Sequence, residues 1–214
     1  TSSIEHPAVV EVCNWLETRG FSITRLPVDS YGWVDPNSLE SAITPETILV
    51  SVMHANNEVG TIQPIADLAA IAHRFGAWFH TDAAQSLGKI LVNVDDSGVD
   101  LLSIAGHKLY APKGIGALYV RSGIELSLQL HGAEQESGRR PGTENVLEIV
   151  GLGKACEIAQ RDLEKNQAHF QSVRDQLYQA LTAELGPDLV RLNGHPEQRL
   201  PNTLSVSFRG VEAN

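Results

Sequence analysis

Asp82 and Lys108 are the residues of this chain whose types and positions best suit chemistry on a charged ring. Asp82 comes just after an apolar run that contains Trp78 and Phe79, and Lys108 comes after the next apolar run. An aspartate at one strand end can pair with a protonated heterocycle, and a lysine at the following strand end can form a Schiff base with the ring's reactive carbon. The stretch from residue 80 to residue 116 therefore predicts a site for such a ligand.

Each of these residues also has a purely structural explanation. Lys108 could extend from a strand end into solvent, and Asp82 could cap the segment that follows it. His80, Asp82 and His107 could together bind a metal ion, but their spacing matches no compact ligand pattern. A metal site would also leave Lys108 unexplained, so we expect no metal centre.

Other polar residues stand where predicted elements begin or end. Alone, His6 is typical of a solvated residue in a first helical turn. Asn56 and Asn57 are ordinary turn formers, and Arg139 and Arg140 are ordinary surface charges. Only as a set do they indicate a functional site.

The composition predicts a globular chain that binds neither nucleic acid nor a membrane. Of its 214 residues, 42% are apolar and 20% are charged, and the net charge of −10 opposes phosphate binding. No stretch approaches the roughly 18 apolar residues of a membrane span, and the amino end does not resemble a signal peptide. Cys13 and Cys156 lie far apart among apolar neighbours, so we expect two small buried thiols in a reducing cytoplasm.

Helical and strand-like patterns alternate along the first half of the chain. Apolar spacing predicts the following order: helix 6–18, strand 21–28, helix 37–43, strand 47–53, helix 64–75 and strand 77–81. This alternation is typical of a doubly wound α/β layer, whose ligands bind at the carboxyl ends of the strands. The polar segments 56–57, 82–85 and 106–108 should therefore converge on one crevice.

The second half of the chain predicts a change of architecture. Residues 115–120 follow a tight loop and favour an antiparallel strand in an otherwise parallel sheet. Helical spacing from residue 149 to residue 185 indicates one helix of roughly 50 Å that joins two domains. The strand-like runs 189–192 and 203–208 begin a second unit. We thus expect a large domain (1–150), a connecting helix (151–186) and an incomplete small α+β domain (187–214), in an internal section of a longer protein.

Five spaced motifs occur in an order that resembles a known family. They are T-S-S-I-E-H-P-A-V (1–9), M-H-A-N-N-E-V-G (53–60), H-T-D-A-A-Q-S-L-G-K (80–89), G-H-K-L-Y-A-P-K-G-I-G-A-L-Y-V (106–120) and R-R-P-G-T-E-N (139–145). The chain resembles the pyridoxal-phosphate cysteine desulfurases of the class V aminotransferase group, and within them the NifS/IscS-like branch. The resemblance implies a fold-type-I enzyme with a mostly parallel sheet in a three-layer large domain.

The resemblance assigns the central chemistry to three residues. Lys108 would hold pyridoxal 5'-phosphate as a Schiff base and move a proton at the substrate's α-carbon. Asp82 would pair with the pyridinium nitrogen and keep the ring protonated. His6 would stack on the ring face and assist proton transfer.

The remaining cofactor contacts are implied in the same way. Gln85 and Asn57 would hold the phenolic oxygen of the ring, and His107 would bond to the phosphate. Thr143 would reach the phosphate bound by a neighbouring subunit, which implies a homodimer.

The chain departs from the family pattern at one phosphate contact. The family commonly has a serine two residues before the His-Lys pair, and this chain has Ala105 there. Ser103 lies on the same face of the strand by the period of two and could compensate partly. We expect weaker retention of the cofactor and unchanged chemistry.

The expected activity is removal of sulfur from L-cysteine, leaving L-alanine. The family's phosphate loop would precede residue 1, and its persulfide-forming cysteine and carboxylate-binding arginine would follow residue 214. The sulfur would then serve iron–sulfur cluster or thionucleoside synthesis through scaffold or sulfur-carrier proteins. Selenocysteine lyase, another class V aminotransferase activity, and a non-catalytic scaffold in cluster assembly are the alternatives.

Overall fold

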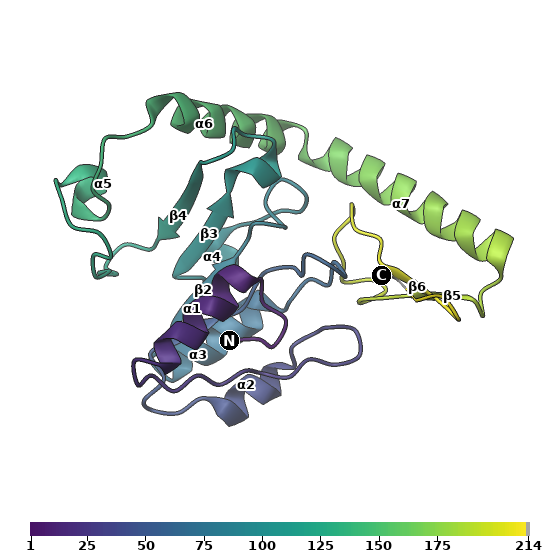
Figure 1. The fold of residues 1–214 in the computed structure, drawn as a ribbon, viewed down its shortest axis with the longest axis horizontal. Helices are drawn as coiled ribbons and strands as arrows, with labels where there is room; N and C mark the ends of the chain where they lie inside the picture. The colour runs from purple at the N-terminus through teal and green to yellow at the C-terminus, as the bar shows by residue number, and fades with distance from the viewer. Residues whose placement is uncertain (213–214) are drawn as a thin grey trace.

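A four-stranded mixed sheet lies at the centre of the molecule (Figure 1). The computed structural model describes residues 1–212. Strands β1 (Leu49–Ser51), β2 (Trp78–Asp82) and β3 (Leu101–Ala105) are parallel and adjacent, and β4 (Gly116–Val120) pairs antiparallel with β3. The predicted α/β layer with one antiparallel strand is therefore confirmed.

One face of this sheet is apolar and forms the core. Val50, Phe79 and Leu102 share that face by the period of two and are buried in one cluster with helix α3 (Ile65–Arg74). Helix α3 presents Leu68 and its apolar neighbours to the sheet, because residues three and four apart lie on one side of a helix. The opposite face carries polar side chains at the strand ends, where the candidate site lies.

The helices of the first half begin where the sequence predicts. Helix α1 (Pro7–Glu17) and helix α2 (Pro36–Ala42) each start with a proline after a capping residue. The caps are His6 and Asp35, whose side chains accept hydrogen bonds from backbone N–H groups of the first turn. The short helix α4 (Val94–Ser97), which the sequence did not predict, is also capped by a side chain, that of Asn93.

The predicted strand 21–28 is wrong. The structure gives this segment a single parallel bridge, between Ser2 and Leu26. The N–H of Ser3 donates to the carbonyl of Leu26 at 2.9 Å, and the N–H of Leu26 donates to the carbonyl of Thr1 at 2.8 Å. The partner segment turns into helix α1 at Pro7, so it is too short to extend this pairing into a strand.

The predicted single long helix is divided in two. Helix α6 (Val146–Arg161) and helix α7 (Leu163–Leu185) meet at Asp162, which has non-helical backbone angles of φ −103° and ψ 9°. Aspartate is a poor helix-interior residue, and the Asp162 carboxylate pairs with the Arg161 guanidinium at 2.6 Å. The two helices also contact different partners: α6 lies on the 3-10 helix η1 (Gly106–Leu109), and α7 contacts strand β5 (Val190–Leu192) (Figure 1).

A two-stranded antiparallel ribbon of β5 (Val190–Leu192) and β6 (Val206–Phe208) lies beside α7 (Figure 1). It confirms the predicted strands near the carboxyl end. A short helical turn, α5 (Gln135–Gly138), precedes α6 and contains left-handed backbone at Glu136 and Ser137. Within residues 1–212, no helix is both long and apolar enough to cross a membrane.

Candidate active site

Asp82, the last residue of β2, lies beside Ser103, the middle residue of β3. They are register partners in the parallel pair, and the N–H of His54, just after β1, donates to the carbonyl of Asp82 at 2.9 Å. The Asp82 side chain is half-buried, and its Oδ1 accepts a hydrogen bond from the N–H of Ala84 at 2.8 Å. The carboxyl ends of β1 and β2 are therefore joined at one edge of the sheet, next to β3.

Lys108 lies in the 3-10 helix η1 that follows β3 directly. A Cβ atom on Gly106 would lie 2.6 Å from the carbonyl oxygen of Ile115, so a glycine is required for this close approach. Tyr110 ends η1 in the left-handed region with φ 64°, and its N–H donates to the carbonyl of Gly106. This tight turn holds the side chain of Lys108 exposed at the strand end.

A small cavity of about 140 Å³ lies between η1 and the junction of α6 and α7. Lys108 lines it together with Lys89, whose Nζ donates to the carbonyl oxygen of Gln85 at 2.9 Å. Burial, and to a smaller degree the charge of Lys108, lowers the pKa of Lys89. The sequence did not predict Lys89 as a site residue, because its partner is a backbone carbonyl that no pattern of side chains reveals.

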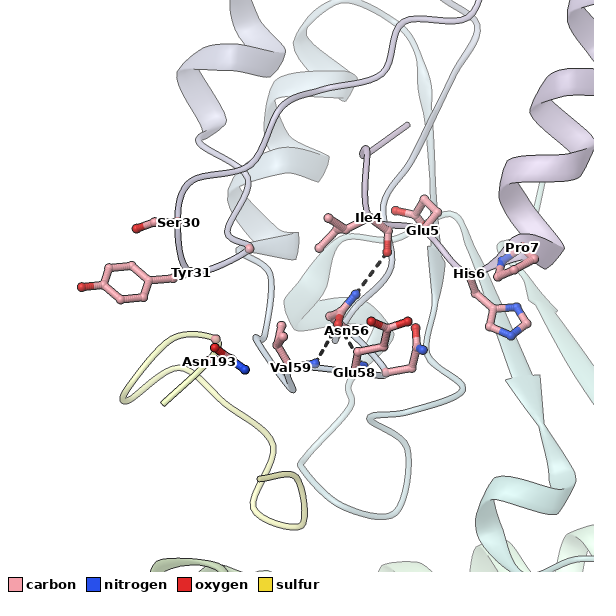
Figure 2. A pocket seen from close by; sticks show the side chains of 13 residues that line it. Ile4, Glu5, His6, Pro7, Ser30, Tyr31, Asn56, Glu58, Val59 and Asn193 are labelled. Carbon is pink, nitrogen blue, oxygen red and sulfur yellow. Dashed lines mark hydrogen bonds between the residues drawn. The ribbon is translucent and has the colours of Figure 1, made fainter. Parts of the chain in front are cut away.

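A larger cavity of about 440 Å³ opens beside the amino end of α1 (Figure 2). His6 and Asn57 line it, as do Tyr31 and Asn193 from more distant segments. The Oδ1 of Asn56 accepts from the N–H groups of Glu58 and Val59 at 3.0 and 2.9 Å. Asn56 thus fixes the loop, and its neighbour Asn57 lines the cavity.

His6 combines a structural and a chemical position. Its Nδ1 accepts a hydrogen bond from the N–H of Ala8 at 3.1 Å, which makes it the cap of α1. An accepting Nδ1 is unprotonated, so a neutral His6 carries its proton on Nε2. The ring is exposed and lies at the edge of the larger cavity (Figure 2).

Glu5 is a buried carboxylic acid next to His6 that the sequence did not single out. Its Oε1 accepts from the hydroxyl of Ser2 at 2.5 Å and from the N–H of Met53 at 2.9 Å. Its Oε2 has no hydrogen-bond partner among the described residues. Burial raises the pKa of Glu5, and the nearby charge of Asp82 acts in the same direction. The E-H dipeptide at the start of a helix was the available signal.

His80 links the three parallel strands through two serines on the polar face of the sheet. Its Nδ1 lies 2.8 Å from the Oγ of Ser51, and its Nε2 lies 3.0 Å from the Oγ of Ser103. Burial lowers the pKa of His80, which favours a neutral ring with one donor and one acceptor. If Nε2 carries the proton, the Ser103 hydroxyl keeps its own proton for another acceptor.

The structure does not bring all the predicted residues into one cavity. His6 and Asn57 line the larger cavity, whereas Lys108 lines the smaller one. Gln85 lies near Lys89 through the carbonyl contact, and His107 precedes Lys108 in η1 with an exposed side chain. Thr143 is exposed on the segment between α5 and α6, where it is open to another chain.

The fold and site define a class of protein, and the chain belongs to the aminotransferase class-V family. The family model described as aminotransferase class-V matches residues 1–214. The chain is 50% identical over 212 residues to the cysteine desulfurase IscS of Dictyoglomus turgidum, covering 99% of this chain and 53% of that relative. The chain therefore spans about half the length of the curated relatives it matches.

Solved structures show the same fold. A NifS-like protein superposes with a TM-score of 0.93 at 41% identity, over 98% of this chain and 57% of the other. SspA in complex with cysteine superposes with a TM-score of 0.81 at 40% identity, over 97% of this chain and 57% of the other. The predicted fold class and the predicted NifS/IscS-like relationship are confirmed.

Proposed function

We propose that this chain is part of a pyridoxal-phosphate-dependent cysteine desulfurase that converts L-cysteine to L-alanine and passes the sulfur on. The observation that carries the proposal is the placement of Asp82 and Lys108 at the ends of neighbouring strands. The names of the relatives and the cysteine-bound neighbour support the same activity.

The side chains present fit pyridoxal phosphate. Asp82 is half-buried and uses Oδ1 for one backbone hydrogen bond, so its carboxylate retains acceptor capacity for a cationic N–H group. Lys108 offers an exposed amine on a rigid turn directly after the neighbouring strand. When bound, the cofactor supplies a ring that withdraws electrons from the substrate's α-carbon.

Lys108 and Asp82 would perform the central proton chemistry. The amine of Lys108 would hold the cofactor at its aldehyde carbon and would accept the α-proton of the substrate. Asp82 would hold the proton on the ring nitrogen through a charge-assisted hydrogen bond. His6, with Nδ1 occupied by Ala8, would use its exposed ring face and Nε2 near the substrate.

The other predicted residues would fix the orientation of the cofactor. Asn57 and Gln85 would bind the phenolic oxygen, and His107 would bind the phosphate. The Ser103 hydroxyl would donate to the phosphate only when Nε2 of His80 carries a proton and donates to that hydroxyl. Thr143, being exposed, would reach the site of a second copy, which makes a homodimer part of the proposal.

The sulfur would leave to a thiolate that attacks the substrate sulfur, so that the carbon–sulfur bond breaks and a persulfide forms. Cys13 is buried in α1, and Cys156 is half-buried in α6. Neither thiol lines the larger or the smaller cavity among the described residues. We therefore assign the acceptor to a residue of the whole protein outside these 214 positions.

The wider setting follows the proposed activity. The persulfide would supply iron–sulfur cluster or thionucleoside synthesis through a scaffold or sulfur-carrier protein, in the cytoplasm. Residues 1–150 would form the cofactor-binding domain, 151–186 the connecting segment and 187–214 the start of a small domain. The two free cysteines agree with a reducing compartment.

Product analysis of the full-length protein tests the proposal. With an added thiol that reduces the persulfide, alanine and sulfide should form in equal amounts from L-cysteine. The same preparation should be compared on L-selenocysteine. Turnover of selenocysteine but not of cysteine would identify a selenocysteine lyase. Amino-group transfer without sulfide release would identify an aminotransferase. No turnover of either substrate would indicate a non-catalytic scaffold. Each of these three results would contradict the proposed function.

A further inference from the structure

Glu5 joins the segment that precedes helix α1 to the loop that follows strand β1. Its Oε1 accepts hydrogen bonds from the Ser2 hydroxyl at 2.5 Å and from the N–H of Met53 at 2.9 Å. Glu5 is 8% exposed and Ser2 is 1% exposed, so little water competes for this oxygen. The bond to Met53 spans 48 positions of the sequence, so it belongs to the tertiary fold and not to a local turn.

A second contact joins the same two segments. The Nδ2 of Asn56 donates to the carbonyl oxygen of Ile4 at 3.1 Å (Figure 2). The Oδ1 of Asn56 accepts from the N–H groups of Glu58 and Val59, which fixes the rest of the loop. The two segments are therefore held together at two points, through residues 4 and 5 on one side and residues 53 and 56 on the other.

The next residue after each of these contacts lines the larger cavity. His6 follows Glu5 directly, Asn57 follows Asn56 directly, and both line the cavity. No hydrogen bond among the described residues joins the side chains of His6 and Asn57 to each other. Their relative placement is therefore set by the contacts of their neighbours. Reaction rates fall steeply when such groups are displaced by a fraction of a bond length.

The contact of Glu5 also lies next to the strand end that carries Asp82. The N–H of His54, the residue after Met53, donates to the carbonyl of Asp82 at 2.9 Å. The Oε2 of Glu5 is buried without a hydrogen-bond partner among the described residues. A buried carboxylic acid with one unpaired oxygen is a costly way to stabilise a fold, so stability alone does not explain this residue type.

We propose that Glu5 is a positioning residue that sets the placement of His6 relative to Asn57 by accepting hydrogen bonds with one oxygen from both segments. The inference rests on the proposed function, because His6 and Asn57 have their tasks only in that reaction. Glu5 itself would touch neither the cofactor nor the substrate. It would act through the residues that follow its two contacts.

Two substitutions in the full-length protein loaded with pyridoxal phosphate separate the reach of the side chain from its charge. Glu5→Asp keeps the carboxylate but is shorter by one methylene and cannot reach both donors, so kcat/KM for L-cysteine should fall about 10-fold. Glu5→Gln keeps an oxygen at the position of Oε1 and should stay within about 3-fold of the unmodified protein. Burial raises the pKa of Glu5, so a neutral amide suits this environment. Glu5→Met removes the acceptor altogether and should lose at least as much as Glu5→Asp.

Hydrogen exchange of the Met53 amide is a readout that does not depend on activity. In the protein freed of cofactor, this amide should exchange at least about 10-fold faster in Glu5→Asp and Glu5→Met than in Glu5→Gln or the unmodified protein. Equal exchange in all four proteins would overturn the inference.

Asp100→Leu is the matched control for lost stability. Asp100 is also a buried carboxylate, 3% exposed, and it accepts from the N–H of Phe79 at 2.8 Å near the amino end of β2. Asp100→Leu should lower the melting temperature, as Glu5→Met does, but should leave kcat/KM within about 3-fold. All variants are assayed below their melting temperatures. Equal losses of kcat/KM in Asp100→Leu and Glu5→Met would show that Glu5 acts only through stability.

The variant His6→Asn tests whether Glu5 acts through His6. Asparagine keeps a capping side chain for α1 but lacks the ring. Adding Glu5→Asp to His6→Asn should lower kcat/KM by less than about 3-fold further, because the group that Glu5 positions is gone. An undiminished 10-fold loss in this background, or an equal loss in Glu5→Gln and Glu5→Asp, would overturn the inference. The proposed function fails in a different way, namely if the unmodified protein forms no alanine from cysteine.

Discussion

Asp82, the last residue of β2, is the register partner of Ser103 in the middle of the parallel strand β3, and Lys108 follows Ser103 by five positions. The turn between them is tight because Gly106 passes close to the carbonyl of Ile115. An acid and an amine are thus mounted on adjacent rigid strand ends. Such mounting holds reacting groups in position more firmly than a long loop would.

Replacing Asp82 tests the hydrogen bond to the ring nitrogen. In the full-length protein, Asp82→Asn should still bind pyridoxal phosphate but should desulfurate cysteine about 100-fold more slowly. A neutral amide cannot stabilise the ring proton, and about 2.7 kcal/mol of transition-state stabilisation corresponds to that factor. Steady-state rates of alanine formation measure the change. Asp29→Asn, in an exposed turn, is the control, and equal rates for both variants would contradict the assignment.

We expect Ala105 to leave out one hydrogen bond to the phosphate, and adding a hydroxyl at this position is a gain-of-binding test. Ala105 is half-buried at the end of β3, opposite Gly116. Ala105→Ser should tighten pyridoxal phosphate binding about 5-fold, since one added hydrogen bond contributes about 1 kcal/mol. Equilibrium dialysis of the full-length protein measures the dissociation constant. The control is Ala117→Ser on the paired strand β4, which should leave the affinity unchanged. A weaker affinity in Ala105→Ser would show that position 105 does not face the phosphate.

Local patterns predicted most of the fold because most helices and strands bury an apolar face, and the spacing of that face is visible in their own residues. The helix predicted for residues 64–75 appears as α3 (Ile65–Arg74), since its apolar stripe is continuous. The strand predicted for residues 21–28 was wrong because a strand needs a paired partner. The partner here is only the short segment around Ser2. The helix break at Asp162 was missed because the apolar spacing continues across it while the two halves contact different elements.

The sequence predicted candidate residues whose chemistry follows from the side-chain type. It missed residues whose role depends on tertiary contacts and burial. Asp82 and Lys108 could be predicted because each follows an apolar run. Lys89 and Glu5 were missed because their roles depend on a distant carbonyl, a distant N–H group and burial. The division of His6 and Lys108 between two cavities depends on the relative placement of α1 and α6, which no local pattern encodes.

Thr61 joins the larger cavity's walls to the carboxyl-terminal segment. Its buried hydroxyl donates to the carbonyl of Tyr31 at 2.6 Å and accepts from the N–H of His195 at 2.9 Å. Thr61→Val keeps the shape but leaves both backbone groups unpaired, so the free energy of unfolding should fall by about 2 to 3 kcal/mol. Denaturant unfolding of the full-length protein measures this loss. Thr61→Ser retains the hydroxyl and should lose clearly less; an equal loss would refute the hydrogen-bond explanation.

His54 makes stability depend on pH. Burial lowers the pKa of His54 to about 4, so the unfolded chain binds a proton there more readily than the folded chain. Its contribution to stability is complete above the ordinary value near 6.5 and is lost as the pH falls toward 4. At about 1.4 kcal/mol per pKa unit, the loss amounts to about 3 kcal/mol.

The variant His54→Gln should reduce this slope in the curve of unfolding free energy against pH between 4 and 6.5, leaving the part that the buried His80 contributes. His131→Gln changes an exposed histidine and should preserve it. Denaturant unfolding at a series of pH values provides the curves. Parallel curves for unmodified protein and His54→Gln would show that His54 is not buried in its neutral form.

The visible absorbance of the full-length protein with Lys108 replaced tests the central claim most directly. Lys108 is the one residue in the proposal whose amine binds the cofactor carbon, and it lies exposed on η1. We predict that Lys108→Ala, mixed with pyridoxal phosphate, lacks the absorbance band of lysine-bound cofactor and forms no alanine from cysteine, while Lys113→Ala retains both. A Lys108→Ala protein that keeps the band and the activity would contradict the account.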